Sequence, residues 1–321
     1  MFERATILYL YVETPLHAGS GTSLGIVDLP IQRERTTGYP IVQASGLKGC
    51  LRDEATYHKD FCQNSACPLY PHADWEKKVE VVFGPETERA SEHAGALSVG
   101  DARILLFPVR SLMGIFAWVT SKDALARFKR DAEMANLSNI SWNPVGPDDE
   151  SKALVAESNI VSADGRIVLE EFAFTAEPCA EVQTIAEWLK DKALPLGAEY
   201  DYWRRSLPQR LIILPENAFR DFTLFSTEVI SRIRLDDEKK TVAHGALWSE
   251  EHLPSDTLLY AMLFAGKPRV KDDDLSDDWK QAGDKVGEIV KFVKGCVDGK
   301  RLQLGGESTV GRGFVKVRMT G

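Results

Sequence analysis

The sequence has few cysteines and no long apolar run. Its five cysteines among 321 residues lack the regular spacing of a disulfide-stabilised secreted domain. No segment approaches the roughly 18 consecutive apolar residues of a membrane-spanning helix. Residues 1–4 lead directly into a strand-like segment, without the small-residue cleavage site of a secretory signal. We therefore expect a cytoplasmic protein with no membrane partner.

Positive charge is also scarce, because 39 Lys and Arg stand against 48 Asp and Glu, a net charge of −9. This balance excludes a protein that coats nucleic acid over its whole surface. The segment 291–321 is an exception, since it carries seven Lys or Arg and only two acidic residues. That excess fits a local cationic track, and it equally fits a solvated terminal helix and strand.

Apolar residues make up 44% of the chain, enough to fill a sizeable core. Without a repeat or a polar linker, the chain predicts one α+β domain over residues 1–321. Apolar, β-prone segments predict strands at 6–12, 101–108, 114–120, 257–265 and 314–319. Periodicity and capping residues predict helices at 45–55, 121–132, 181–192, 199–206, 216–224 and 276–294. The pair Asp164-Gly165 predicts a type I′ turn that joins 160–161 to 167–169.

Two segments, 58–95 and 136–153, are rich in turn-forming residues, and we expect them to be loop insertions in the α+β core. Segments 229–235 and 241–248 predict a long projecting hairpin, in which charged and apolar residues alternate around Arg232.

The sharpest local signal is a loop near the C-terminus with four glycines, Gly305, Gly306, Gly311 and Gly313. Backbone amides in such a loop can bind an anion, and Arg312 adds a charged contact for a phosphate. The alternative is a glycine-rich hairpin turn. A strand follows this loop, not a helix opened by Lys-Ser/Thr, so it matches neither a Walker loop nor a Rossmann fingerprint. This argues against a nucleotide-dependent phosphotransferase.

A second cationic feature follows the first predicted strand. Ser45 is the expected N-cap of a helix whose face carries Lys48 and Arg52, four residues apart. The free amides at the start of such a helix favour a phosphate. The same pattern also occurs in ordinary amphipathic helices.

Candidate acid–base groups lie in two places. Asp28 lies within an apolar run shortly after His17, where a carboxylate can bind a divalent cation, accept a proton or cap a turn. Glu250 and His252 come after the predicted hairpin and add further acid–base groups, or form an ordinary solvated charge cluster.

Two histidines and two cysteines lie close together in the sequence: His58, Cys62, Cys67 and His72. Such a set can bind zinc tetrahedrally, but the closer Cys-x-x-Cys spacing of a zinc knuckle is absent. Free thiols in a loop are the alternative.

The order of these motifs resembles the RAMP superfamily of CRISPR-associated proteins, and within it the repeated backbone subunits of type III-B (Cmr) effector complexes. The resemblance spans nearly the whole chain. It is carried by segments 14–21, 25–34, 45–49, 95–111, 227–233, 245–254 and 310–313.

The resemblance implies an RRM-like, ferredoxin-type palm with a β-hairpin thumb within 227–252. It implies that copies of the chain stack head to tail along a CRISPR RNA, together with other Cmr subunits. Each copy would act as an endoribonuclease that cleaves complementary target RNA with a divalent metal, Mg²⁺ or Mn²⁺. Cleavage would occur beside a base that the thumb splays out.

The same resemblance implies roles for single residues. Asp28 matches the essential acidic residue, either as a ligand of the divalent cation or as the group that activates the ribose 2′-hydroxyl. His17, Glu250 and His252 fall at supporting catalytic positions. The residues expected to meet the guide RNA are Ser45, Lys48, Arg52, Arg232, Gly305, Gly306, Gly311, Arg312 and Gly313.

Two other functions remain open. The first is a scaffold with the same fold, in which another subunit cleaves the target. Asp28 argues against it, because a carboxylate beside the target strand would repel phosphate without serving a purpose. The second is a stand-alone endoribonuclease that processes CRISPR precursor transcripts, and the long hairpin argues against that.

Overall fold

The computed structural model describes residues 2–23, 25–61, 69, 74–137, 140–236 and 241–321. Within them, twelve strands form one sheet and two more form a separate hairpin. The strands are β1 Arg4–Val12, β2 Ile41–Val42, β3 Leu97–Val99, β4 Ala102–Ser111, β5 Ile115–Ser121, β6 Lys152–Val155, β7 Arg166–Leu169, β8 Phe172–Pro178, β9 Leu211–Leu214, β10 Glu228–Leu235, β11 Val242–His252, β12 Leu258–Ala265, β13 Arg301–Gln303 and β14 Phe314–Thr320.

The helices are α1 Ala44–Phe61, α2 Trp75–Phe83, α3 Lys122–Met134, α4 Ala180–Lys192, α5 Asp201–Arg210, α6 Glu216–Phe225, α7 Asp277–Gln281 and α8 Lys285–Val297. Short 3₁₀ turns are η1 Thr87–Arg89, η2 Ala198–Tyr200, η3 Asp272–Asp274 and η4 Ser308–Val310. None of the helices in the described ranges combines the length and the apolar character needed to cross a membrane.

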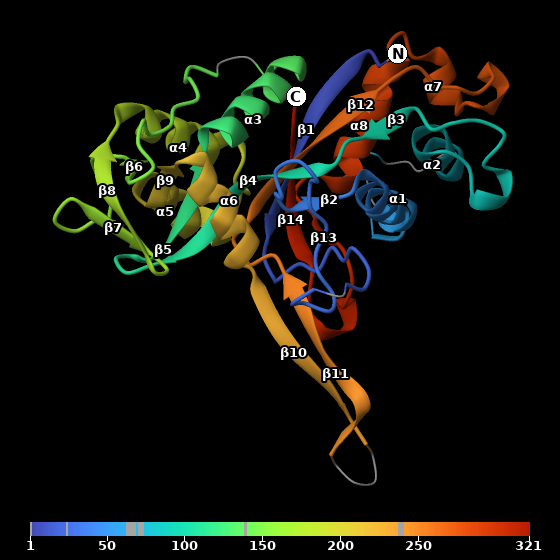
Figure 1. The fold of residues 1–321 in the computed structure, drawn as a ribbon. Helices are drawn as coiled ribbons and strands as arrows, with labels where there is room; N and C mark the ends of the chain where they lie inside the picture. The colour runs from blue at the N-terminus through green and yellow to red at the C-terminus, as the bar shows by residue number, and fades with distance from the viewer. Residues whose placement is uncertain (1, 24, 62–68, 70–73, 138–139, 237–240) are drawn as a thin grey trace.

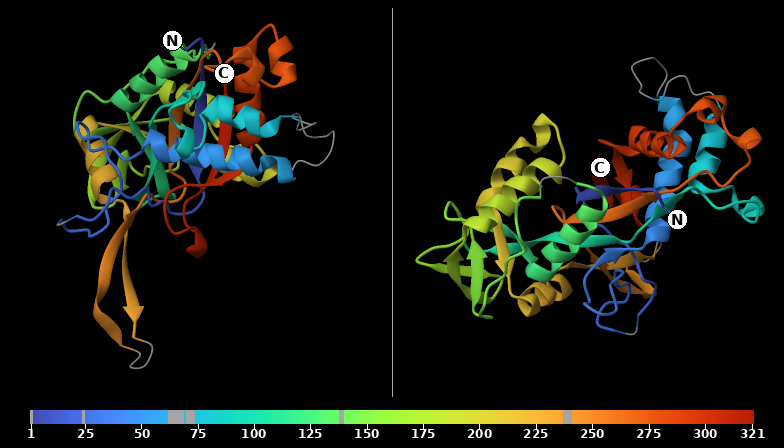
Figure 2. Two further views of the ribbon diagram at one scale, coloured as in Figure 1. Left: turned by 90° about the vertical axis from the view of Figure 1, so that its right-hand side faces the viewer. Right: turned by 90° about the horizontal axis from the view of Figure 1, so that it is seen from above.

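Strand β1 lies between β12 and β14, and both pairings are antiparallel. Its sequence is apolar without alternation because both of its faces are buried. Leu8 and Leu10 face one core, to which α1 and α8 contribute. Ile7 and Tyr9 face a second core, formed with α3, α4 and α5. Helices therefore lie on both sides of this part of the sheet, as the view from above in Figure 2 shows.

The sheet has two parts that share β4. The first runs in the order β13-β14-β1-β12-β4, and the second continues from β4 through β5-β9-β6-β8-β7. A bridge between Ser111 of β4 and Leu169 of β7 closes the second part into a barrel-like circuit. The mixed α+β class expected from the sequence is thus confirmed.

Strands β10 and β11 form the hairpin, which extends away from the body in Figure 1 and in the left view of Figure 2. The strands expected at 229–235 and 241–248 are confirmed, but β11 continues to His252. Glu250 therefore lies within the strand and not after it. The strand is longer than expected because β10 pairs with it as far as Glu228 opposite His252, and Leu29 adds a bridge to Glu250.

Two helix starts were predicted with different success. Ser121 caps α3 as expected, and its Oγ accepts a hydrogen bond from the amide of Ala124 at 3.3 Å. Ser45 is not the N-cap of α1, because the helix begins at Ala44 and Ser45 lies exposed in its first turn. The carboxylate of Asp101 accepts the hydrogen bond from the Ala44 amide instead, at 2.8 Å. A residue distant in the sequence has taken the place of a local cap.

Two other local predictions were correct only in part. The type I′ turn is confirmed, since Asp164 and Gly165 have positive φ values of 49° and 71°. Its expected partner is wrong, because β7 pairs along its length with β8 and not with 160–161. The helix expected at 276–294 is interrupted at 282–284, which separates α7 from α8.

The segments expected to be loop insertions contain ordered structure. Segment 58–95 includes the end of α1, all of α2 and η1. Within 136–153, Trp142 is fully buried, and its ring lies parallel to that of Phe128 with centroids 6.3 Å apart. The described parts of both segments therefore pack on the core, and their status as insertions stays a prediction.

Replacement of Leu10 by alanine removes a fully buried side chain from the centre of β1. The lost transfer free energy and the cavity left behind should lower the free energy of unfolding by about 2–5 kcal/mol. The same change at Leu112, which is 75% exposed, should cost less than about 0.5 kcal/mol. Chemical denaturation measures both values, and equal losses would contradict the central placement of β1.

Candidate functional site

The end of β11 lies between two loops from opposite ends of the sequence, at the root of the hairpin (Figure 1). Side chains alternate along a strand. Ser249 and Glu251 contact the loop that follows β1. Glu250 and His252 contact Glu307 in the loop before β14. One strand thus joins the N-terminal and C-terminal loops.

Asp28 is exposed beside this root. Its Oδ2 accepts hydrogen bonds from the amide and the hydroxyl of Ser249 at 2.7 and 2.8 Å, and its own amide donates to the same hydroxyl at 3.0 Å. These hydrogen bonds hold the pKa of Asp28 below its usual value. The acidic residue singled out in the sequence is therefore an exposed, ionised group at neutral pH.

Glu251 fixes the loop that carries Asp28. One oxygen of its buried carboxylate pairs with the guanidinium of Arg33 and accepts from the Thr227 hydroxyl at 2.8 Å. The other oxygen accepts from the amide of Ile31 at 3.0 Å. A buried charge is tolerated here because both oxygens have donors. The loop is therefore held firmly against β11.

The other face of β11 carries an ionic network. Arg232 of β10 pairs with Glu250 at 3.4 Å and also with Glu307. His252 Nε2 lies 2.9 Å from Oε2 of Glu307, and the indole of Trp248 donates to Glu250 at 2.6 Å. Burial favours a higher pKa for Glu307, but hydrogen bonds with His252 and Glu250 and the charge of Arg232 outweigh it, so the pKa is lowered. Glu307 is thus an anion that ties the C-terminal loop to both strands.

The same network contains three possible metal ligands. The ligand atoms of Glu250, His252 and Glu307 all lie within 4.8 Å of one another. Arg232 already contacts both carboxylates, so one of their two negative charges is compensated within the protein. Asp28 takes no part in it. The catalytic set expected from the sequence is therefore divided between the two faces of β11.

His17 lies next to the network and is half-buried. Its Nδ1 is 2.7 Å from the carbonyl oxygen of Glu251, which can only accept, so Nδ1 carries a proton and Nε2 of the neutral ring keeps the lone pair. Gly19 makes room for the ring, since a Cβ there would come within 2.7 Å of Nε2. The ring centroids of His17 and His252 are 5.4 Å apart. His17 therefore has the tautomer that can accept a proton at Nε2.

The glycine loop packs on the N-terminal loop. Gly305 has a φ of 74°, and a Cβ there would collide with the carbonyl oxygen of His17, so only glycine fits. The amides of Gly306 and Gly313 donate to the carbonyls of His17 and Pro15, at 3.1 and 3.0 Å. The glycines therefore permit close contact between two backbone segments.

Further amides of this loop are also engaged. Those of Gly311 and Arg312 donate to the carbonyls of Ser308 and Glu307 at 3.1 and 3.3 Å. The guanidinium of Arg312 lies 4.0 Å from Glu228. Because these amides already have acceptors, the geometry favours a glycine-rich turn over an anion-binding nest. Contact of the loop with RNA stays a prediction.

The cationic face expected on α1 is present and partly engaged. The Nζ of Lys48 donates to the carbonyl of Leu97 at 3.0 Å, and Nη1 of Arg52 donates to that of Pro85 at 3.1 Å. Burial, with the added charges of Arg52 and Arg269, lowers the pKa of Lys48. The three like charges repel one another and create a local positive field, which favours an anion. Arg269 was not anticipated from the sequence, because it is distant from α1 along the chain.

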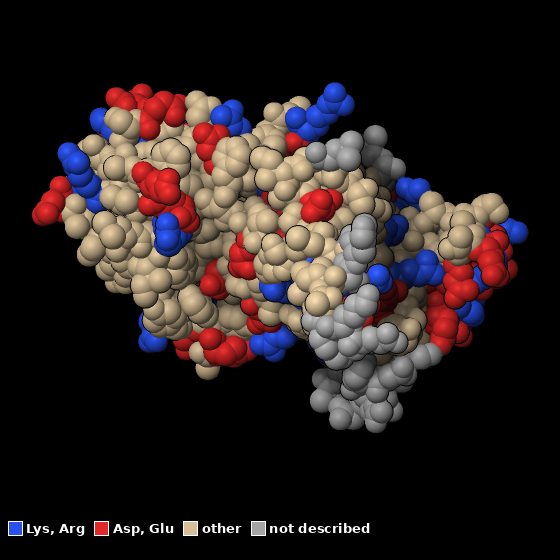
Figure 3. Space-filling view, turned by 60° about the horizontal axis from the view of Figure 1, so that its bottom comes forward, with Lys and Arg blue, Asp and Glu red and all other residues tan. Residues whose placement is uncertain are grey.

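The surface around the hairpin end has no uniform charge. Figure 3 shows basic and acidic side chains interspersed in small groups over this face.

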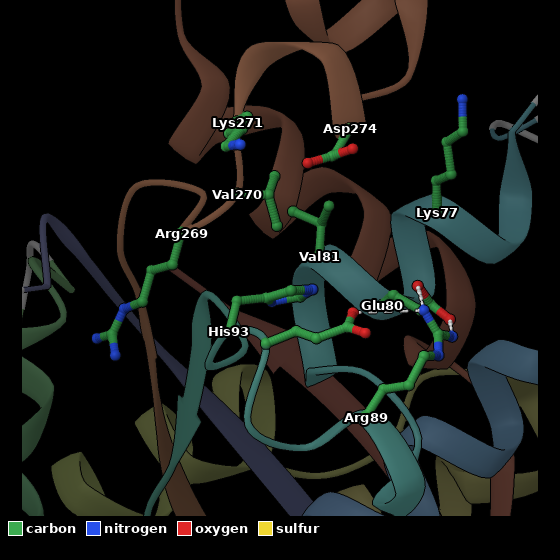
Figure 4. Close-up of a pocket in the computed structure, with 10 residues that line it drawn as sticks. Lys77, Glu80, Val81, Arg89, His93, Arg269, Val270, Lys271 and Asp274 are labelled. Carbon is green, nitrogen blue, oxygen red and sulfur yellow. Dashed lines mark hydrogen bonds and ion pairs between the residues drawn. The ribbon is translucent and has the colours of Figure 1, made fainter.

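A cavity of about 510 Å³ lies between α2 and segment 269–274, on the side of α2 shown in Figure 4. Glu80 and Arg89 form an ion pair on its wall, and Lys271 and Asp274 also line it. Its mixture of charges selects no class of ligand, so we place the candidate site at the hairpin root.

Three of the predicted zinc ligands, Cys62, Cys67 and His72, lie outside the described residues. His58 is described and buried, and its ring is stacked on that of Trp75 with centroids 5.7 Å apart. Zinc binding stays a prediction.

Sequence reasoning missed Ser249 and Glu307 as site residues. Ser249 can be recognised as a site residue only when β11 is known to continue to His252. The alternation of side chains along the strand then places Ser249 on the face of Asp28. Glu307 had one visible signal, an acidic residue within an otherwise basic glycine loop.

Known proteins resemble this chain over nearly its whole length. Residues 9–316 match the family model of the RAMP superfamily. The chain is 41% identical over 316 residues to the CRISPR system Cmr endoribonuclease Cmr4 of Pyrococcus furiosus, with 98% of this chain and 96% of that protein covered.

Two solved structures are similar over nearly their full length. The crystal structure of oligomeric Cmr4 from Pyrococcus furiosus has a TM-score of 0.68 and 34% identity, covering 99% of this chain and 98% of that one. A chain of the cryo-EM structure of the type III-B Cmr-beta bound to cognate target RNA has a TM-score of 0.67 and 23% identity, with the same coverage. The second likeness shows the fold alone.

Replacement of Glu307 by glutamine leaves Arg232 with one carboxylate and removes the anion facing His252. We expect the free energy of unfolding to fall by about 2 kcal/mol at neutral pH, the usual contribution of a charged hydrogen bond. Because the folded-state pKa of Glu307 lies below the usual 4.5, its contribution is present above pH 4.5 and is lost as the pH falls through the folded value. Urea denaturation at neutral pH and in acid should show the difference from wild type shrinking. A difference that stays constant would contradict the network.

Proposed function

The chain belongs to the RAMP superfamily, and from that premise we propose that it is the repeated backbone subunit of a type III-B CRISPR effector complex. It binds a CRISPR RNA in stacked copies, beside other Cmr subunits, and cleaves complementary target RNA at regular intervals in the cytoplasm. The similar protein of Pyrococcus furiosus is named as an endoribonuclease, which supports a catalytic subunit over a scaffold.

The observation that carries this proposal is the environment of Asp28. Its carboxylate is exposed at the root of a projecting hairpin, and Ser249 engages only Oδ2. Among the described residues, no hydrogen bond engages Oδ1. An exposed carboxylate with one oxygen oriented by its neighbour and the other unengaged is suited to act on a ligand from outside the chain.

A divalent cation fits this site. Mg²⁺ and Mn²⁺ prefer oxygen ligands, and Mg²⁺ in particular is often held by one or two carboxylates together with water and substrate phosphates. Asp28 would hold it through Oδ1. When bound, the cation would supply positive charge to the phosphate oxygens of the target. Because its pKa is lowered, Asp28 is a weak proton acceptor at neutral pH, so we assign it to cation binding and not to the role of general base.

The remaining residues have supporting roles in this proposal. The target's 2′-hydroxyl oxygen attacks the adjacent phosphorus as its proton passes to an acceptor. The bond to the 5′ oxygen breaks, and that oxygen takes up a proton from water. We assign the acceptor to Nε2 of His17, which keeps a lone pair, so the target backbone must reach from Asp28 across the hairpin root to His17. Glu250 and His252 are buried and act indirectly, because they hold Arg232 and Glu307 in place.

Guide binding is assigned to the palm. Four neighbouring strands of the sheet lie in the order β14-β1-β12-β4. Along the chain, α1 comes between β1 and β4, and α8 comes between β12 and β14. This arrangement supports an RRM-like, ferredoxin-type palm, and β10–β11 would be its thumb. Lys48, Arg52 and Arg269 present positive charge to the RNA backbone, and such contacts do not depend on guide sequence. Ser45, Arg232, Arg312 and the glycine loop complete the expected guide contacts.

Replacement of Asp28 by asparagine should reduce target cleavage by about 100-fold or more, because it removes the exposed charge but not the shape. Guide binding should be unchanged. The measurement is cleavage of a labelled complementary RNA by the reconstituted complex, with and without divalent metal. The matched control is Asp164→Asn, an exposed turn residue at a φ that asparagine tolerates. Wild-type cleavage by the Asp28 variant would indicate a scaffold subunit.

Replacement of Lys48 by methionine keeps the apolar stem and removes the charge. Guide affinity should fall for every guide sequence, and the slope of log affinity against log salt should decrease by about 1. Filter binding over a salt series measures both quantities. An unchanged slope would place the guide elsewhere on the surface.

A further inference from the structure

Ser249 connects the hairpin to the loop that carries Asp28. It lies near the end of β11, where β10 holds it in register opposite Ser231. Its hydroxyl accepts from the amide of Asp28 at 3.0 Å and donates to Oδ2 of the same residue at 2.8 Å. Its own amide donates to that oxygen at 2.7 Å. One residue thus makes three hydrogen bonds to Asp28.

The loop around Asp28 has little packing of its own. Asp28 is exposed, and Ile26 close by is also fully exposed. The amide of Ser23 donates to the carbonyl of Asp28 at 2.8 Å, which closes the loop on itself. Ser249 contacts Asp28 itself, while Glu251 holds the loop further along, at Ile31 and Arg33. The Asp28 side chain is exposed, and two hydrogen bonds from Ser249 to its Oδ2 fix its rotamer.

The hairpin root that carries Ser249 is fixed on both faces. Glu251 binds Arg33 below the Asp28 loop, and Arg232 binds Glu307 on the opposite face. Ser249 is therefore attached to a well-anchored part of β11, and Asp28 takes its position from that strand.

From this geometry we propose that Ser249 is a positioning residue for target cleavage: it couples the carboxylate of Asp28 to the hairpin, so that the target position set by the hairpin also sets the position of the carboxylate. This inference rests on the proposed function, because it assigns Ser249 to the same cleavage site. A single hydroxyl both accepts from and donates to Asp28, which threonine can reproduce and alanine cannot.

The first test uses the free protein and needs no cleavage. Hydrogen exchange at the amide of Asp28 should be about 10-fold faster in Ser249→Ala, because the acceptor of that amide is lost. Ser249→Thr should exchange like wild type. Ser231→Ala is the matched control, since it removes a hydroxyl from the facing position of the same hairpin. Wild-type exchange in Ser249→Ala would overturn the proposed coupling.

The second test uses the reconstituted complex with labelled target RNA. Ser249→Ala should lower the single-turnover cleavage rate by about 10-fold, as loss of a supporting hydrogen bond to a reactive group does, while target affinity stays unchanged. Ser249→Thr should restore the rate, and Ser231→Ala should cleave normally. In an Asp28→Asn background, Ser249→Ala should have no additional effect, because the coupling acts only through Asp28.

The outcomes separate the two proposals. Normal cleavage by Ser249→Ala, together with an inactive Asp28→Asn variant, would overturn the positioning role and leave the proposed function intact. Normal cleavage by Asp28→Asn would overturn the proposed function, while faster exchange in Ser249→Ala would still support the structural link.

Discussion

The architecture of the site depends on the need to satisfy buried charge at the end of β11. Glu250 and Glu251 are each 5% exposed and His252 is fully buried, and a buried charge or polar group without partners is costly. Because side chains alternate along the strand, the partners must come from both faces. The loop after β1 supplies Arg33 on one face, and the loop before β14 supplies Glu307 on the other. The two ends of the chain therefore meet at the hairpin root.

The function that we propose requires an acidic protein to present different charges to two RNA strands. Much of its positive charge is paired internally, as at Arg33 and Arg232. A positive field remains around Lys48, where we place the guide. The exposed anion Asp28 lies at the hairpin root, where we place the target strand. The overall net charge of −9 predicts neither the positive field around Lys48 nor the negative charge at Asp28, because electrostatic effects depend on distance and burial.

Several local predictions succeeded because their causes lie within a few residues. The apolar run of β1, the Ser121 cap and the turn at Asp164-Gly165 each follow from neighbouring side chains or from backbone preferences. Local patterns could not show the contacts that distant segments make. Asp101 caps α1 in place of Ser45. The glycine loop, which has the composition of a phosphate-binding loop, makes close backbone contact with the N-terminal loop.

The linear pattern of residues was sufficient to indicate the α+β class and the family resemblance and to single out Asp28 as a candidate, because these depend on local periodicity and on motif order. It could not show that Ser249 holds Asp28, that Glu307 lies between Arg232 and His252, or that Glu250 lies on the opposite face from Asp28. Those contacts join residues separated by 55 to 221 positions. They form only after the sheet has brought both ends of the chain to one strand. Hydrogen bonds and ion pairs act over a few ångströms, so the spacing of residues along the sequence does not predict them.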